Sequence, residues 1–344
     1  MRIGVAGVGR IGAFHAATLA QTPGVAEVVV ADVQPGAAEA AAERLGVRAV
    51  GSVEELLAAG LDGFVIAAAT SVHDPLLRAG LAAGVPTFCE KPVAGTLAES
   101  VDLVEAERAA SVPVQVGFQR RFDRGYRAAR DAVQAGDLGW LHTVRLNTFD
   151  QSPPPAAYIP TSGGIFRDCS VHDFDILRFV TGREVASVFA TGGNQGEAFF
   201  AEADDVDTGA ALLTLDDGTM ALASATRYNG GGHDVRMELM GSRASLGVGL
   251  DDSLVMRSAE GDLPWPAGPV KTTFMERFEP AYRAELAAFV EVAAGRMPSP
   301  CTVADALQAF RIAEACEISR HEHRPVELAE IAAPQGTQQV HAPG

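Results

Sequence analysis

The sequence predicts an α/β domain followed by an α+β domain with a large, mainly antiparallel sheet. Its 344 residues suffice for about two domains. Up to about residue 118, short β-branched runs alternate with Ala- and Leu-rich stretches, which is typical of a parallel sheet covered by helices. Further on, several runs alternate polar and apolar residues, which favours antiparallel strands with one exposed face. We expect domains at 1–119 and 120–330, and a polar tail at 331–344.

The first half reads as a regular alternation of strands and helices. The expected strands are Arg2–Ala6, Glu27–Ala31, Gly63–Ala68, Thr87–Glu90 and Val114–Phe118. The expected helices are Ile11–Gln21, Pro35–Leu45, Val53–Ala59, Asp74–Ala83 and Leu97–Ala110. This rhythm predicts βαβ units with parallel strands.

The second half reads mostly as strands. These are expected at Leu141–Phe149, Val185–Thr191, Asp207–Leu215, Thr219–Arg227 and Asp234–Met240, with a hairpin turn at Asp217-Gly218. One helix is expected at about Ile165–Val180, ending before Gly182. Two helices close the chain, one at about Ala281–Ala294 and one from Thr302, where Asp305 completes a capping box. These last helices are candidates to pack back on the first domain.

Composition excludes several functional classes. The net charge of −17 argues against a nucleic-acid or anionic-membrane partner, because both require a basic surface. No apolar run reaches the roughly 20 residues of a membrane helix, and no secretory leader is evident, so we expect a cytoplasmic protein. The four cysteines have no zinc-type spacing, which predicts reduced, packed thiols and no metal site.

A glycine-rich turn predicts a dinucleotide site. Gly7-Val8-Gly9-Arg10-Ile11-Gly12 follows the first strand and opens a helix. In such a turn the three glycines allow the tight bend, close approach to pyrophosphate and helix–strand packing, and the helix N-terminus attracts phosphate. Asp32, at the end of the second strand, is placed to bind ribose hydroxyls and repel a 2′-phosphate. We therefore expect a Rossmann domain that binds NAD in preference to NADP, although Arg10 leaves NADP open and Asp32 is alternatively a solvated loop residue.

Lysine usage singles out one residue. Of the 27 basic residues, 25 are Arg, and the two lysines are Lys91 and Lys271. Lys91 lies in Glu90-Lys91-Pro92 at the carboxyl end of a predicted parallel strand, the edge where α/β sheets bind ligands. A compact ammonium there could hydrogen-bond a reacting alcohol oxygen. The alternative is a surface lysine paired with Glu90.

A second candidate pair begins the helix of the second domain. Asp168 and His172 are four residues apart, so their side chains share one helix face. A neutral imidazole could take a hydroxyl proton, while the carboxylate could bind substrate hydroxyls or hold the imidazole. Spacing alone leaves a solvated Asp–His pair, extended by Asp175, as an equal alternative.

Together these motifs resemble the Gfo/Idh/MocA oxidoreductases, in particular their inositol 2-dehydrogenases. The stretch Val114-Gln115-Val116-Gly117-Phe118-Gln119-Arg120-Arg121-Phe122-Asp123 adds to the resemblance, which spans about residues 1–330. It implies NAD-dependent oxidation of a ring hydroxyl of a cyclic polyol, most simply myo-inositol to its 2-keto form, by a homotetramer. It also implies a catalytic set of Lys91, Asp168 and His172.

The resemblance extends less firmly to other positions. It places cofactor contacts at Thr70, His73, Glu90 and Lys91, with His73 alternatively only a helix-start residue. Substrate contacts are expected among Arg121, Asn147, Tyr228, Asn229 and His233, for each of which packing or ordinary exposure is an equal alternative. Other sugars, anhydrosugars or aminocyclitols are alternative substrates. An NAD-binding regulatory module is the alternative outside enzymes, and it would not need the Lys–Asp–His set.

Overall fold

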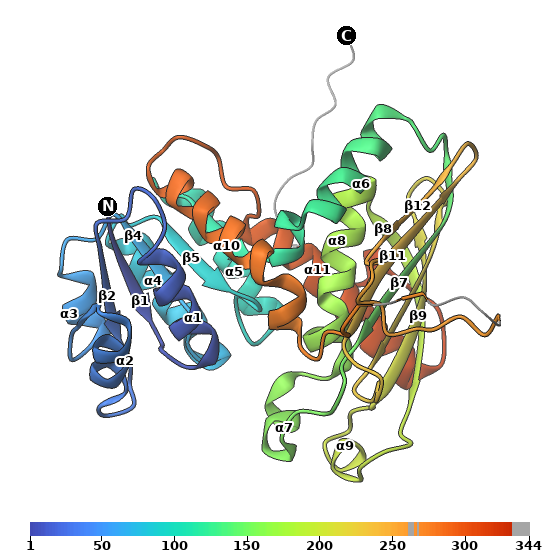
Figure 1. Ribbon diagram of the computed structural model, residues 1–344, viewed down its shortest axis with the longest axis horizontal. Helices are drawn as coiled ribbons and strands as arrows, with labels where there is room; N and C mark the ends of the chain where they lie inside the picture. Colours follow the sequence, from blue (N-terminus) through green and yellow to red (C-terminus); the bar gives the residue numbers. More distant parts are fainter. Residues whose placement is uncertain (261–264, 267, 332–344) are drawn as a thin grey trace.

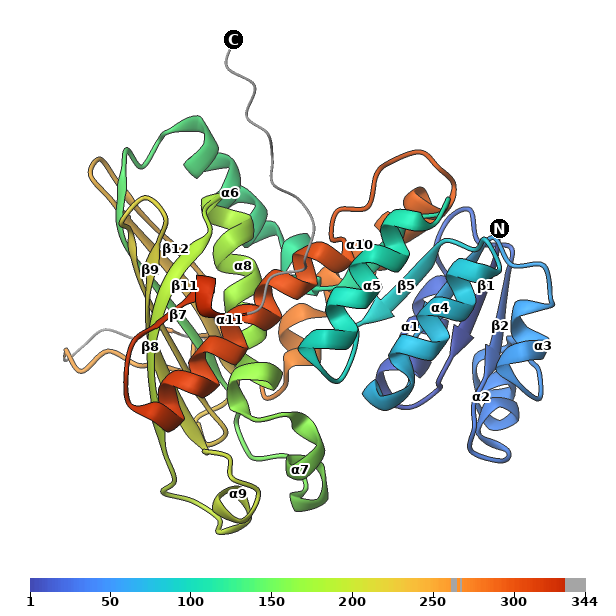
Figure 2. The ribbon, with the colours of Figure 1, turned by 180° about the vertical axis from the view of Figure 1, so that it is seen from behind.

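The computed structural model describes residues 1–260, 265–266 and 268–331. Two sheets lie at opposite ends of the molecule, and four helices lie between them (Figures 1 and 2). These are α6 (Arg124–Ala135), α8 (Val171–Thr181), α10 (Phe274–Ala293) and α11 (Val303–Glu322). Most of the predicted tail, residues 332–344, lies outside the described residues. No helix within the described part of the chain is long and apolar enough to span a bilayer.

The first sheet is parallel and has the strand order β3-β2-β1-β4-β5-β6. Its strands are β1 Arg2–Ala6, β2 Glu27–Ala31, β3 Arg48–Ala49, β4 Gly63–Ile66, β5 Thr87–Glu90 and β6 Val114–Gly117. Its helices are α1 Arg10–Leu19, α2 Ala37–Leu45, α3 Val53–Leu57, α4 His73–Ala82 and α5 Leu97–Ala109. Apolar side chains of α1 and α2 pack on one face, and those of α3, α4 and α5 pack on the other. The predicted α/β domain is confirmed.

The second sheet is mixed and mostly antiparallel, with the order β12-β11-β7-β10-β9-β8-β13. Its strands are β7 Leu141–Phe149, β8 Val185–Gly193, β9 Thr208–Leu215, β10 Met220–Thr226, β11 Asp234–Gly241, β12 Ser245–Val248 and β13 Val326–Glu327. Asp217-Gly218 forms the predicted turn between β9 and β10, with Gly218 at a φ of 86°. The central pair β7 and β10 is parallel, so the carboxyl ends of these two strands meet at one edge.

Several helices differ from the sequence prediction. The helix expected at 165–180 consists of a π-helical turn, Phe166–Ser170, followed by α8, Val171–Thr181. The helix expected at 281–294 is α10, Phe274–Ala293, which starts earlier, at the Thr273 cap, and contains Pro280. Sequence analysis missed α6, Arg124–Ala135, as well as the short α7, Ile159–Ser162, and α9, Phe199–Glu202. α11, Val303–Glu322, begins at the predicted Thr302 and Asp305 capping box.

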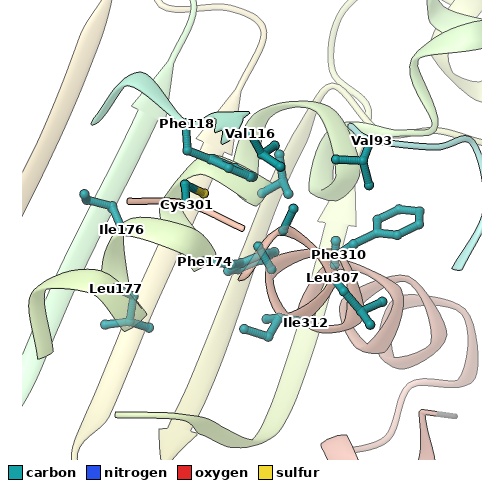
Figure 3. Packing of buried hydrophobic residues seen from close by; sticks show 14 of the residues in the cluster. Val93, Val116, Phe118, Phe174, Ile176, Leu177, Cys301, Leu307, Phe310 and Ile312 are labelled. Carbon is teal, nitrogen blue, oxygen red and sulfur yellow. The ribbon is translucent and has the colours of Figure 1, made fainter. Parts of the chain in front are cut away.

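A continuous apolar core joins the two halves (Figure 3). Val116 of β6 and Phe118, which follows that strand, belong to the same buried cluster as Phe174 of α8 and Phe310 of α11. A second cluster seats Leu286 of α10 and its apolar neighbours on the first sheet. Both closing helices therefore contact the first half, and the boundary near residue 119 stays a prediction.

One carboxyl group is buried between the first sheet and α10. Glu285 is fully buried, and neither side-chain oxygen has a hydrogen-bond partner within the described part of the chain. Burial raises the pKa of Glu285 well above its ordinary 4.5, and the nearby Glu90 and Asp175 add to the effect. Burial therefore favours the neutral acid at this position.

The free energy of unfolding of the wild type should fall as pH rises, and Glu285→Gln should remove this fall. Because the folded pKa is raised, the contribution of Glu285 is fully present below its ordinary pKa and is lost as pH rises through the raised value. Urea unfolding across pH should show the variant gaining stability relative to wild type toward alkaline pH. Glu279→Gln, an exposed change on the same helix, is the control. Parallel curves for wild type and Glu285→Gln would contradict the assignment.

Candidate active site

The glycine-rich turn has the geometry that its sequence predicts. Gly7 has a φ of 91°, and a Cβ there would lie 2.7 Å from the main-chain oxygen of Ala67. A Cβ at Gly12 would lie within 2 Å of the main-chain oxygen of Gly7, so only glycine lets the helix approach the strand. A Cβ at Gly9 would meet nothing within 4 Å among the described residues, which leaves the space that a pyrophosphate needs.

Asp32 closes the same site. Its Oδ2 accepts a hydrogen bond of 2.7 Å from the main-chain N–H of Val8, inside the glycine-rich turn. Its Oδ1 accepts one of 2.8 Å from the main-chain N–H of Gln34. The carboxylate is thus held just after the end of β2, beside the glycine-rich turn.

The other predicted cofactor residues surround the turn in different ways. Arg10 is the first residue of α1, and its guanidinium lies 5.0 Å from the ring centroid of Phe274. Ile11 packs partly buried against the core, and Thr70 begins the 3-10 turn that follows β4. Together with the open space at Gly9, these positions fit a dinucleotide.

Lys91 reaches across to the second half of the chain. Its Nζ donates to the main-chain oxygen of Asp168 at 2.9 Å and to the carboxylate Oδ1 at 3.1 Å. An ammonium has three N–H bonds, so one remains for another acceptor. Glu90, the partner in the surface-lysine alternative, instead contacts His15 at 2.6 Å. The structure therefore brings together the predicted Lys91 and Asp168.

Sequence analysis missed three residues of this network. Arg227 donates to Asp168 Oδ2 at 2.7 Å and to Asp150 Oδ2 at 3.1 Å. The Tyr158 hydroxyl donates to Asp168 Oδ1 at 3.0 Å. Asp150 follows β7 and Arg227 follows β10, so the parallel pairing of these strands places both at one edge. The available sequence signal was an acidic residue after one strand and a basic residue after another. That signal could be used only if the two strands were known to be parallel.

The network determines the charge of Asp168. Burial alone would favour the neutral acid, but the positive charges of Lys91 and Arg227 outweigh it and hold the pKa of Asp168 well below its usual range. Asp168 is therefore an anion at neutral pH and has little capacity to take up a proton. Its position in a π-helical turn fits the frequent occurrence of such turns at functional sites.

His172 has the opposite electrostatic environment. Burial lowers the pKa of His172 well below 6.5, and the charges of Lys91 and Arg120 lower it further. The ring packs edge-on against Phe118, with centroids 5.7 Å apart, and its Nδ1 has no hydrogen-bond partner among the described residues. Within the same residues, no hydrogen bond joins it to Asp168. The imidazole is thus neutral at pH 7, and Asp168 does not hold it directly.

Two predicted substrate residues lie elsewhere. Arg121 is buried and donates twice to Asp175, at 2.8 and 2.6 Å, so it forms an internal ion pair. Asn147 lies on the outer face of the second sheet, where its amide meets Ser224 and Arg236. Neither position supports a substrate contact within this chain.

The other three substrate candidates lie on the network side of the sheet. His233 is buried, and its Nδ1 is 3.4 Å from Asp150 Oδ1. The main-chain N–H of Asn229 donates to the main-chain oxygen of Asp150 at 2.8 Å. Tyr228 is more exposed, and its hydroxyl accepts from the main-chain N–H of Glu197. Their positions keep them as candidates.

Two predicted cofactor residues face the interior. Glu90 contacts His15 of α1, and His73 is 1% exposed with both ring nitrogens near main-chain oxygens. Both side chains therefore contact other protein groups in this structure. No group of three His, Cys, Asp or Glu side chains in the described ranges is arranged to hold a metal ion.

Comparison with known families and proteins follows the same division of the chain. Residues 1–118 match the oxidoreductase family with an NAD-binding Rossmann fold, and residues 126–247 match the Gfo/Idh/MocA C-terminal domain. A myo-inositol dehydrogenase of Streptomyces leeuwenhoekii is 39% identical over 322 residues, covering 93% of this chain and 97% of the relative. The chain belongs to the Gfo/Idh/MocA oxidoreductase family. The resemblance predicted from its motifs is confirmed.

Other Gfo/Idh/MocA proteins extend the comparison. A myo-inositol 2-dehydrogenase of Thermotoga maritima is 32% identical, with 96% of this chain and 99% of the relative aligned. The structure of a scyllo-inositol dehydrogenase of Lactobacillus casei, solved with NAD(H) and scyllo-inositol, superimposes with a TM-score of 0.86 at 29% identity. That match covers 96% of this chain and 99% of the other.

Proposed function

We propose that this oxidoreductase oxidises a ring hydroxyl of a cyclic polyol with NAD, and that myo-inositol, giving the 2-keto form, is its substrate. The observation that carries the proposal is the contact of Lys91 with Asp168, which joins the end of β5 to the π-helical turn that precedes His172. The inositol dehydrogenases among its relatives support the choice of substrate.

The residues of the first half fit NAD. Gly7, Gly9 and Gly12 would let the pyrophosphate approach the N-terminus of α1, and Asp32 would accept the ribose hydroxyls. When bound, the nicotinamide accepts a hydride from the substrate carbon.

The proposed chemistry divides between three side chains. His172, neutral because of its lowered pKa, takes the proton from the reacting hydroxyl. Lys91 donates its remaining N–H to the same oxygen and stabilises the negative charge that develops there. Asp168 stays ionised and orients both Lys91 and the substrate hydroxyls, so it is not the base.

A substrate panel tests this function. NADH formation should be fastest with myo-inositol or another inositol, and slow with aldoses, anhydrosugars and aminocyclitols. Faster oxidation of an aldose would indicate that the substrate is a sugar and not an inositol. NAD binding without turnover across the panel would instead support a regulatory module.

We also propose the cytoplasm as the site of the reaction, where free thiols such as the four buried cysteines remain reduced.

Asp32 should determine the choice of NAD over NADP. In Asp32→Asn the repulsion of a 2′-phosphate is lost, so the ratio of kcat/KM for NAD to that for NADP should fall about tenfold, equivalent to roughly 1.4 kcal/mol. Steady-state kinetics with both cofactors measures the ratio. Asp62→Asn, at the amino end of the same sheet, is the control. An unchanged ratio in Asp32→Asn would show that another group sets the preference.

We propose that a second copy of the chain covers the outer face of the second sheet. Phe189, Leu212 and Leu222 are neighbours across β8, β9 and β10, and each is 42–45% exposed. Such an apolar row is typical of an interface. Leu212→Glu should lower the mass measured by light scattering toward that of the monomer, whereas Thr214→Glu on the same face, away from the row, should lower it less. A monomeric wild type would contradict this proposal.

A further inference from the structure

Two buried histidines contact the residues on either side of Lys91. His15 of α1 is fully buried, and its Nε2 lies 2.6 Å from Oε1 of Glu90, the residue before Lys91. His73 begins α4, and its Nδ1 lies 2.7 Å from the main-chain oxygen of Pro92, the residue after Lys91. One imidazole therefore contacts the side chain of the residue before Lys91, and the other contacts the backbone of the residue after it.

Each histidine also belongs to a segment that shapes the cofactor site. His15 lies on α1, the helix that the glycine-rich turn opens. The Nε2 of His73 is 3.0 Å from the main-chain oxygen of Ala68, and a Cβ on Gly7 would lie 2.8 Å from the Cα of Ala68. Each histidine therefore connects a segment next to the dinucleotide turn with the strand end that carries Lys91.

The surroundings hold both rings in place. His15 packs edge-on against Phe88, with ring centroids 5.6 Å apart, and also meets Tyr282 of α10. His73 is 1% exposed, and its two ring nitrogens face carbonyl oxygens, which only accept hydrogen bonds. Imidazoles packed this tightly have few alternative rotamers, so they fix the positions of the groups that they contact.

We propose that His15 and His73 are positioning residues that hold the Lys91 ammonium in register with the nicotinamide site. The proposal rests on the function proposed above. Neither ring needs to touch cofactor or substrate for this role. Each acts through the chain beside Lys91, so the loss of either contact should affect turnover more than cofactor binding.

Kinetics of four variants test the role. A misplacement of about 1 Å can cost about a hundredfold in rate, so His15→Leu and His73→Leu should lower kcat at least about tenfold. The Kd for NAD should stay within about threefold of wild type. His15→Gln and His73→Gln retain an amide N–H donor and should recover part of the loss. His142→Leu, an exposed change on β7, is the control. Loss of NAD binding in proportion to kcat would overturn the proposal.

A double-variant comparison separates positioning from general destabilisation. If the histidines act through Lys91, adding His73→Leu to Lys91→Arg should lower kcat by less than about threefold, although His73→Leu alone lowers it much more. Full additivity of the two losses would assign His73 a structural role and overturn the proposal. Circular dichroism and urea unfolding identify any variant that fails to fold, and the Gln variants then carry the test.

A measurement without substrate distinguishes failure of this proposal from failure of the proposed function. With isotope-labelled lysine, the protein has two lysine Cε signals, and Lys271→Arg assigns them. His15→Leu and His73→Leu should shift the Lys91 signal toward that of a free, mobile lysine and leave the Lys271 signal unchanged. An unmoved Lys91 signal in both variants would overturn the positioning role, whether or not the wild type oxidises inositol.

Discussion

Lys91→Arg should lower kcat with myo-inositol by about a hundredfold or more while NAD binding persists. The guanidinium keeps the charge and can still pair with Asp168, but its planar fork replaces the compact ammonium that places a third N–H toward the substrate oxygen. Steady-state rates and the NAD dissociation constant together measure the two effects.

The same Lys→Arg substitution at the second lysine provides the control. Lys271 pairs with Asp251 at 3.1 Å on an exposed loop, and Lys271→Arg should leave kcat within about twofold, as expected of a surface ion pair. Equal, small effects of the two Lys→Arg changes would mean that Lys91 is not part of the chemistry.

His172→Gln should lower kcat by between about a hundredfold and ten-thousandfold, because it removes the proposed general base. The amide keeps the approximate size of the imidazole but cannot accept the hydroxyl proton at neutral pH. Initial rates with saturating NAD measure the loss, and His142→Gln on the exposed side of β7 serves as the control.

The pH profile should identify His172 as the same base. Since burial lowers the pKa of His172 below 6.5, the neutral base persists at pH 7 and is lost only as pH falls through the lowered value. The acid limb of kcat/KM should therefore lie below pH 6.5 in the wild type and disappear in His172→Gln. Asp168 should not produce this limb, because Lys91 and Arg227 hold its pKa well below its usual range. Retention of the limb in the variant would assign it to another group.

The sequence was most informative where local chemistry determines structure. Gly7 and Gly12 each occupy positions at which a Cβ would collide with the backbone, so their spacing alone predicted the turn. The capping box at Thr302 located the start of α11 in the same way. By contrast, α10 was predicted too short, because the helix continues through Pro280 to start at Phe274. α6 was missed, although Asp123 caps its start and Gly136 its end.

The candidate site was predicted only in part, because some of its contacts depend on pairing between distant strands. Lys91 and Asp168 were found from motifs, and they meet in the structure. Arg227 and Asp150 could not be found, since only the parallel pairing of β7 and β10 brings them together. Arg121 was a substrate candidate from the family resemblance, with packing as the alternative, and its buried partner Asp175 lies 54 residues away in sequence.

Myo-inositol deuterated at the carbon that bears the reacting hydroxyl allows the hydride transfer to be followed directly. Deuterium should appear in the reduced cofactor, and the deuterated substrate should react more slowly than the unlabelled one. Lys91→Arg should abolish most of this transfer, whereas Lys271→Arg should not. Reduced NAD without deuterium, or no reduction of NAD by any inositol, would contradict the proposed oxidation of a polyol ring hydroxyl.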